Sequence, residues 1–170
     1  AITGPNASQF AFGPGTLSQT LNPGQTKLVK LRFLPTSVGQ KTAYFRVETD
    51  DAVGTYVDTL LGTAIDTTAP LAPISAGINP SGWSKTNLFT ISWTNPTDPS
   101  GIAKIWYRID ALPTIAVPGD SIALTGSSAQ VSMPSAGTHN IYFFLQDSAG
   151  RKNVSNYNTV AAKYDNVPPT

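Results

Sequence analysis

Cysteine is absent from this chain, and charged residues and long apolar runs are scarce. The lack of cysteine excludes disulfide bonds and thiolate chemistry, and it leaves the redox compartment open. Charged residues make up 12% of the sequence, the net charge is +1 and no basic run occurs, so the electrostatic pattern of nucleic-acid binding is missing. No stretch approaches the roughly 18 apolar residues of a membrane-spanning helix, so we expect no membrane insertion in this segment.

Residues that favour helices are also few. The sequence has a single glutamate, Glu48, among its ten acidic residues, and no segment sustains a helical period of 3.6. Threonine, serine, valine and asparagine are common, and glycine and proline number 14 each. This composition favours strands and turns over helices, so the sequence predicts an all-β fold.

Apolar and polar residues alternate along several short segments of the first 65 residues. These segments are TKLVKLRF, KTAYFRVE and YVDTLLG, at 26–33, 41–48 and 56–62. In the last of them, Val57 and Leu61 are predicted to face the core. Turn signals separate the segments, including one at Asp50 and Asp51, where aspartate favours a tight turn. Strands this short at this spacing are typical of a sandwich or a barrel.

A proline-rich segment separates two parts of the chain. IDTTAPLAP occupies residues 65–73, and a near copy of its beginning, DNVPP, occupies 165–169. Because proline fixes φ, lacks an N–H donor and keeps the preceding residue extended, each phrase predicts a stiff linker between modules. The chain therefore divides into a first domain at 1–65, a second at 66–165, and the start of a further linker or module at 166–170.

The alternation resumes after this phrase. The strongest predicted strands are LFTISW, IAKIWYRID and IYFFLQD (88–93, 102–110 and 141–147), and SIAL, AQVSM and YNTVAAKY (121–124, 129–133 and 157–164) are weaker. A domain near 100 residues built from such strands has the size of an immunoglobulin-like sandwich.

Three stretches of the second domain carry a family resemblance. They are ISWTNPTDPSGI, IWYRID and GTHNIYFFLQDSAGRKN, at 91–102, 105–110 and 137–153. With these stretches the domain resembles the fibronectin type III-like and related immunoglobulin-like modules of large bacterial surface and secreted proteins. Arg151 stands where that pattern usually carries asparagine. The resemblance implies a two-sheet sandwich and says little about function.

The first domain has a resemblance of its own. It rests on ITGPNASQFAF, LNPGQT, LRFLPTSVGQKTAYFRVETDD and VDTLLGTA, at 2–12, 21–26, 31–51 and 57–64. These stretches are similar to the back half of an ASH-type (choice-of-anchor D-like) immunoglobulin domain. Roughly thirty residues that supply the first strands of that family do not precede the ITGP phrase here, which implies a sandwich lacking its N-terminal strands and an unpaired sheet edge.

Acidic residues are predicted to meet at one end of the second domain. In the sandwich that the resemblance implies, the loop after the second strand, the loop after the sixth strand and the incoming linker lie at the same pole. These segments carry Asp66, Asp98, Asp147 and Asn153. Because calcium takes six to eight oxygen ligands from such loops, they are a candidate calcium site at the domain joint. The alternative is that each aspartate caps its own turn.

Four further side chains are predicted to point outward from two neighbouring strands. They are Trp106, Arg108, Tyr142 and Phe144. An exposed aromatic patch of this kind could bind a surface glycan or pack on another module. The alternatives are that the face assignment is off by one residue, or that long loops cover the patch.

Catalytic groups are not suggested by the sequence. The single histidine, His139, shares strand parity with Ile141 and Phe143 and is predicted to point inward as a structural residue. No carboxylate close to it in the sequence supports a nucleophile–histidine–acid arrangement. The expected protein is therefore not an enzyme.

The expected function is that of a structural spacer or adhesion module of a large cell-surface or secreted protein, with neighbouring modules of the same chain as partners. Ala1 begins without the regions of a secretion signal, so we expect the chain to be a segment whose targeting signal lies upstream. Two alternatives remain. One is a carbohydrate-binding accessory module; the other is a self-assembling filament subunit that accepts a strand from another copy of itself.

Overall fold

The computed structural model describes residues 1–15 and 18–166 and divides into two compact units, Ala1–Ile65 and Asp66–Thr170. Its regular structure is almost entirely β-strand, which confirms the predicted all-β class. Within the described residues the helical structure is one short 3-10 turn, η1 (Ala7–Gln9), and no helix is long and apolar enough to cross a lipid bilayer. Most of the further linker or module predicted at 166–170 lies outside the described residues.

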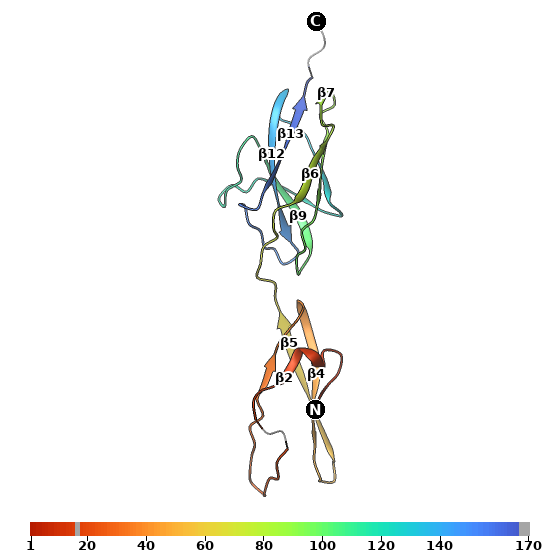
Figure 1. The fold of residues 1–170 in the computed structure, drawn as a ribbon, viewed down its shortest axis with the longest axis vertical. Coiled ribbons are helices and arrows are strands. Elements are labelled where there is room, and N and C mark those ends of the chain that lie inside the picture. Colours follow the sequence, from red (N-terminus) through yellow and green to blue (C-terminus); the bar gives the residue numbers. More distant parts are fainter. Residues whose placement is uncertain (16–17, 167–170) are drawn as a thin grey trace. The chain divides into compact units, whose positions relative to one another are not determined.

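The first unit contains two small antiparallel sheets (Figure 1). Its strands are β1 (Ile2–Thr3), β2 (Phe10–Phe12), β3 (Leu31–Phe33), β4 (Gly39–Glu48) and β5 (Thr55–Ala64). β4 lies between β1 and β5 in one sheet, and β2 pairs with β3 in the other. The turn from β4 to β5 is closed by Asp51, whose Oδ1 accepts the N–H groups of Val53 and Gly54 at 2.9 Å each. This is the turn chemistry that the Asp50–Asp51 pair predicts.

The register of the β4–β5 hairpin decides which side chains face inward. Ala43 lies opposite Leu60, so the two share a face, and Ala43 is fully buried. Val57 and Leu61 point to the other face and are 58% and 65% exposed. The prediction that Val57 and Leu61 face the core is therefore wrong.

The reason for this reversal lies in Gly62. A Cβ built at Gly62 would come within 2.8 Å of the Phe33 ring. Phe33 of β3 can therefore pack against the face of β5 that carries Gly62, because glycine has no side chain there. The adjacent leucines, Leu60 and Leu61, give both faces of the strand an apolar residue. The alternation of apolar residues therefore could not predict which face of β5 turns inward. Packing against Phe33 determines that face.

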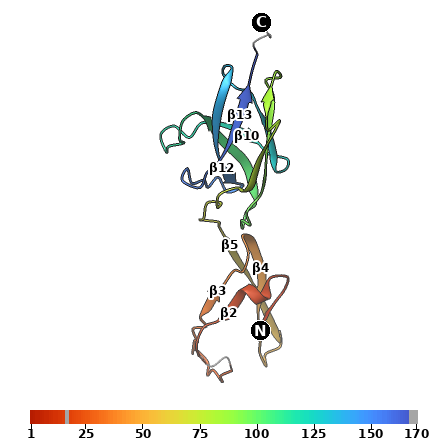
Figure 2. The same ribbon diagram turned by 45° about the horizontal axis from the view of Figure 1, so that its top comes forward.

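The second unit is a two-layer sandwich of eight strands (Figure 2). They are β6 (Ile74–Asn79), β7 (Trp83–Ser84), β8 (Phe89–Thr94), β9 (Ile102–Ile109), β10 (Asp120–Ala123), β11 (Ser128–Val131), β12 (Gly137–Asp147) and β13 (Asn158–Tyr164). One sheet has the order β10-β9-β12-β13-β7, and the other has the order β11-β8-β6. The weaker strands expected near 121–124, 129–133 and 157–164 are confirmed as β10, β11 and β13.

The core of this unit lies between its two sheets. Buried side chains recur at every second position of β8 and β12, as the alternation predicted. They include Phe89, Ile91, Trp93, Ile141, Phe143 and Leu145, none more than 5% exposed. Such a face is the ordinary consequence of the two-residue period of a strand with one side turned to the core.

The proline-rich segment before β6 packs against the second unit. Pro70 and Pro73 are buried, and their carbonyl oxygens accept hydrogen bonds from the side-chain amides of Asn156 (2.7 Å) and Asn158 (3.0 Å). The segment has no strand assignment, as the prolines predicted. It is nevertheless held along its length, so residues 66–73 belong to the sandwich and are not a free linker.

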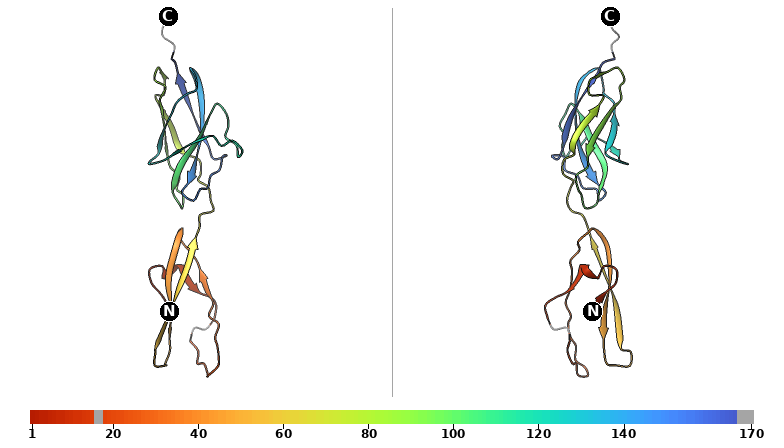
Figure 3. Two further views of the ribbon diagram at one scale, coloured as in Figure 1. Left: turned by 180° about the vertical axis from the view of Figure 1, so that it is seen from behind. Right: turned by 45° about the vertical axis from the view of Figure 1, so that its right-hand side comes forward.

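The loop from β9 to β10, residues 110–119, stands away from the sandwich of the second unit (Figure 3). Ile115 at its centre is 90% exposed, and Leu112 and Val117 are about half exposed. The loop returns to the sheet at Gly119, where φ is +108°.

Candidate metal centre

Asp147 is a carboxylate at a position that would normally hold a core side chain. It ends β12 and has the parity of Ile141, Phe143 and Leu145, and its exposed fraction is 2%. Its Oδ1 accepts the backbone N–H of Arg151 at 2.6 Å, and Gly150 completes the turn with φ of +83°. Its Oδ2 is buried and has no hydrogen-bond partner. Asp147 therefore brings an unsatisfied carboxylate oxygen to the end of the sandwich.

Asp98 is placed by a tight turn between β8 and β9. Its carbonyl oxygen accepts the N–H of Gly101 at 3.2 Å, and its Oδ1 accepts the N–H of Ser100 at 3.1 Å. Gly101 has φ of +75°, a conformation that glycine adopts without steric cost. The turn keeps the Asp98 side chain half-buried against the end of the sandwich.

Asp66 is the first residue of the second unit and is also buried. Its Oδ1 accepts the N–H and the hydroxyl of Thr68, and its Oδ2 accepts the hydroxyl of Ser100 at 2.7 Å. The Thr68 backbone N–H, followed by the Ser100 and Thr68 hydroxyls, holds the pKa of the Asp66 carboxyl below its ordinary value. Asp66 is therefore a carboxylate at neutral pH.

The three aspartates lie together at one end of the second unit. Each offers a carboxylate oxygen, and these oxygens all lie within 4.8 Å of one another. In residues 1–15 and 18–166, no lysine, arginine or histidine nitrogen lies within 4.0 Å of these carboxylates. Hard, clustered oxygen donors without a cationic partner are the chemistry that calcium and magnesium ions prefer.

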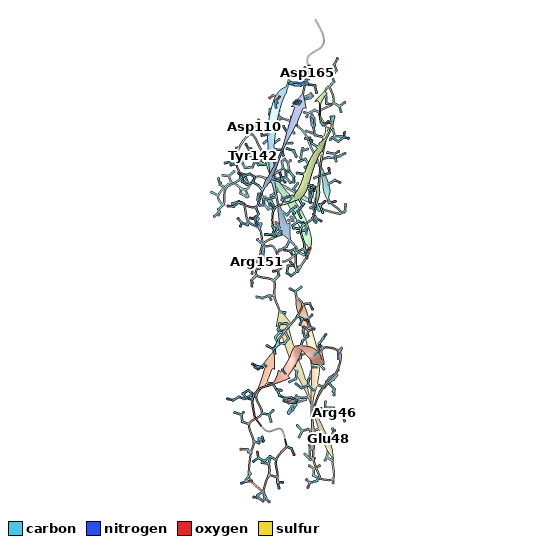
Figure 4. All side chains as sticks on the ribbon, in the orientation of Figure 1. Arg46, Glu48, Asp110, Tyr142, Arg151 and Asp165 are labelled. Carbon is cyan, nitrogen blue, oxygen red and sulfur yellow. The ribbon has the colours of Figure 1, made fainter. Side chains whose placement is uncertain are left out.

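Asn153, the fourth residue expected at this site, is engaged elsewhere. Its side chain is exposed, and its Oδ1 accepts the N–H of Ser155 at 3.0 Å within its own loop. The structure thus brings together Asp66, Asp98 and Asp147, and the place of Asn153 at this site stays a prediction. Arg151, labelled in Figure 4, marks the same end of the unit and contacts Asp147 through its backbone.

The predicted aromatic face is present but is not open. Trp106 lies opposite Phe144 and Arg108 lies opposite Tyr142, so the four side chains share one face of β9 and β12. Phe144 is completely buried, while the other three are half-buried. The expectation that all four side chains are exposed is therefore wrong for Phe144.

The segment that follows β12 covers this face. The Lys152 ammonium lies 3.6 Å from the centre of the Trp106 ring, and Tyr157 packs against Tyr142 with ring centres 5.7 Å apart. The Trp106 ring is itself stacked on Phe144. A stacked sugar would need the position that Lys152 occupies, so glycan binding here stays a prediction that requires Lys152 to move.

His139 is buried, as its parity predicted, but it does have a carboxylate partner. Its Nδ1 lies 2.5 Å from Asp110 Oδ2, and its Nε2 lies 3.0 Å from the carbonyl oxygen of Ser135. The expectation that no carboxylate supports His139 is wrong, because Asp110 follows the strand that pairs with β12. Both ring nitrogens face protein acceptors, so neither is free to take a proton from a substrate.

The Asp110–His139 pair gives a pH-dependent contribution to stability. The hydrogen bond from His139 is the main reason that the pKa of Asp110 lies below its ordinary value. A lowered carboxyl pKa stabilises the folded state above the unfolded-state pKa near 3.9, and this contribution is lost as pH falls through the folded pKa. We expect Asp110→Asn to cost about 1 kcal/mol or less at pH 7, since the Asp110 side chain is 48% exposed.

Urea unfolding of wild type and Asp110→Asn between pH 2 and 7 measures this contribution. The difference between the two unfolding free energies should shrink as pH falls below about 4, because the Asp110 carboxylate of the folded protein is then protonated. A difference independent of pH over the whole range would show that the Asp110 charge is irrelevant to stability.

The chain has only low similarity to known proteins. No family model and no curated protein matches the chain. Among solved structures, the chain is similar to the Clostridium perfringens spore cortex lytic enzyme SleM, with 13% identity, a TM-score of 0.42, and coverage of 69% of this chain and 37% of that one.

Two animal proteins show similar values. The rat CD45 extracellular region, domains d3–d4, has 7% identity and a TM-score of 0.43 over 89% of this chain and 76% of that one. The chicken CNTN1 FN1–FN3 domains have 12% identity and a TM-score of 0.41 over 91% of this chain and 55% of that one.

Proposed function

We propose that the chain is a non-catalytic structural or adhesion segment of a cell-surface or secreted protein. The continuous apolar core of the second unit is the observation that carries this proposal. The segment that leads into the unit is also fastened to it, through the buried Asp66, Pro70 and Pro73.

We extend the same structural or adhesion role to the first unit, as a neighbouring module of the second. On the resemblance of its sequence, we propose that it is the back part of an ASH-type immunoglobulin domain. The single histidine supports a non-catalytic role, because Asp110 and Ser135 occupy both of its ring nitrogens.

Single-molecule force spectroscopy on the full chain tests the proposal. We expect the second unit to unfold in one discrete event that releases roughly 330–360 Å of chain, less the end-to-end length of the folded unit, because about 100 residues extend by about 3.3–3.6 Å each. Gradual extension without a discrete event would contradict a load-bearing role.

A second candidate function is the acceptance of a strand from another copy of the chain. β5 is ten residues long and forms an edge of its sheet, with β4 as its partner in the described residues. Ala43 is the one hydrophobic residue of the described first unit that is fully buried, whereas Val57 and Leu61 on β5 are exposed. A long apolar edge strand is a template for pairing with a further strand.

Leu61→Lys tests this second function, because a charged side chain on an edge strand opposes intermolecular pairing. Light scattering after size exclusion should show a mass that rises with concentration for the wild type and stays near 17.9 kDa for the variant. Leu28→Lys is the matched control, since Leu28 is 82% exposed and lies outside the strands. A wild type that remains at 17.9 kDa at every concentration would exclude strand exchange.

A further inference from the structure

We propose that Asp66, Asp98 and Asp147 bind one divalent cation, Ca²⁺ in preference to Mg²⁺, at the end of the second unit. The site lies wholly within that unit, and it does not depend on the structural function proposed above. Three observations carry it: an unsatisfied buried oxygen, an uncompensated cluster of negative charge, and three carboxylate ligands from separate segments.

The unsatisfied oxygen is Oδ2 of Asp147. The residue is 98% buried, yet this atom has no hydrogen-bond partner, while Oδ1 accepts the N–H of Arg151. Buried carboxylates in proteins are paired, hydrogen-bonded or coordinated to a metal, because an unsatisfied one is strongly unfavourable. The oxygen belongs to the residue that joins Asp66 and Asp98 in the cluster. A cation between the three aspartates satisfies it.

The charge of the cluster is uncompensated. Three carboxylates have oxygens within 4.8 Å of one another, and the described residues place no basic nitrogen within 4.0 Å of them. Like charges this close repel, and the repulsion is relieved either by a proton or by a bound cation. Burial of Asp66 and Asp147 strengthens the repulsion, because solvent screens it less.

The Ser100 hydroxyl holds two of the ligands in position. It lies 2.7 Å from Asp66 Oδ2 and 3.2 Å from Asp98 Oδ1. The ligands therefore come from a prearranged pair and from Asp147, whose own turn is fixed by Gly150. Ser100 is a positioning residue for this site, and Asp66, Asp98 and Asp147 are the ligands.

The number of carboxylate ligands favours calcium over magnesium. Ligand oxygens bind Ca²⁺ at 2.3–2.6 Å, so two of them can be up to about 5.2 Å apart across the ion. Mg²⁺ requires about 2.0–2.1 Å, which limits that separation to about 4.2 Å. The three carboxylate oxygens lie within 4.8 Å of one another, a limit that separations suited to either ion can meet. Mg²⁺ usually keeps several waters and takes one or two carboxylates, whereas Ca²⁺ takes six to eight oxygen ligands in flexible geometry, so three carboxylates favour Ca²⁺. Water completes either coordination shell.

A bound cation would join three segments that are far apart in the sequence. Asp66 lies in the segment leading to β6, Asp98 lies in the loop between β8 and β9, and Asp147 ends β12. Because the unfolded chain does not hold these residues together, the cation binds the folded state preferentially and stabilises it.

Thermal unfolding of the full chain after chelator treatment, with CaCl₂ or MgCl₂ added from 10 μM to 10 mM, tests the proposal. We expect Tm to rise with each tenfold increase in CaCl₂ beyond the dissociation constant, which for extracellular modules is about 10⁻⁴–10⁻³ M. Isothermal titration should give one saturable site per chain. MgCl₂ should require at least tenfold higher concentrations for the same shift.

Asp147→Asn and Asp98→Asn are the informative variants. Both should lose the calcium response, and Asp147→Asn should have a higher Tm than the wild type in chelator, because it removes a buried uncompensated charge. This reversal of sign separates a ligand from a residue with a merely structural role. Asp120→Asn, an exposed aspartate of the same unit, is the matched control and should keep the full response.

Absence of any Tm shift or saturable heat up to 10 mM CaCl₂ would overturn the site. An undiminished calcium response in Asp98→Asn would also overturn it, because the half-exposed Asp98 can be replaced without disturbing the core. Equal responses to both salts would overturn the preference for calcium. None of these results affects the force-spectroscopy test of the structural function. The cation site and the structural function can therefore each be refuted without refuting the other.

Discussion

Replacing Ile105 by alanine is expected to lower the unfolding free energy of the second unit by about 2–5 kcal/mol. Ile105 is fully buried in β9 and lies opposite Leu145 on β12 and Ile122 on β10. Because the core is close-packed, removing three carbon atoms here loses their transfer free energy and leaves a cavity.

The matched control for this change is Ile115→Ala. Ile115 is 90% exposed in the β9–β10 loop, so its replacement should alter stability by no more than about 0.5 kcal/mol. Urea unfolding followed by tryptophan fluorescence suits both variants, because Trp83, Trp93 and Trp106 all lie in the second unit. Equal effects of the two substitutions would contradict the placement of the core.

Gly119→Ala is expected to destabilise the second unit by at least about 1–3 kcal/mol. The φ angle of Gly119 is +108°, and an added Cβ would lie 2.1 Å from the carbonyl oxygen of Tyr107 and 2.8 Å from its carbonyl carbon. These are backbone atoms of β9, which cannot move without breaking the pairing of Asp120 with Tyr107. The clash should therefore release β10 from the sheet.

Gly126→Ala is the control for that variant. Gly126 has no atom within 4 Å of a built Cβ and does not have a positive φ, so alanine should be neutral or stabilising by up to about 1 kcal/mol. Hydrogen exchange should show faster exchange of the β10 amides only in Gly119→Ala. Comparable stability of the two variants would mean that the backbone at Gly119 can relax.

The fold of the second unit could be predicted because its strands have one buried face. The two-residue period of β8 and β12 places Phe89, Ile91 and Phe143 inside without any knowledge of their partners. The β5 strand of the first unit lacked this property, since Leu60 and Leu61 are adjacent. The contact of Phe33 with Gly62 decided which face of β5 turns inward, and that contact joins residues far apart in sequence.

At the candidate metal centre, too, some features could be predicted from the sequence and others appear only in the structure. The sandwich that the sequence resemblance implies led us to predict Asp66, Asp98 and Asp147 at one pole. The burial of Asp147, the missing partner of its Oδ2 and the bridging Ser100 hydroxyl appear only when three separate segments meet. The same is true of His139, whose partner Asp110 comes from another strand.

The sequence by itself determined the all-β class, the core face of the main strands of the second unit and the aspartates in its turns. These features follow from local rules, namely strand alternation, proline geometry and side-chain capping. The tertiary structure alone decided that residues 66–73 pack on the second unit, that Phe144 lies beneath a covering segment, and that three carboxylates share one site. Those features depend on contacts between distant segments, which no local pattern encodes.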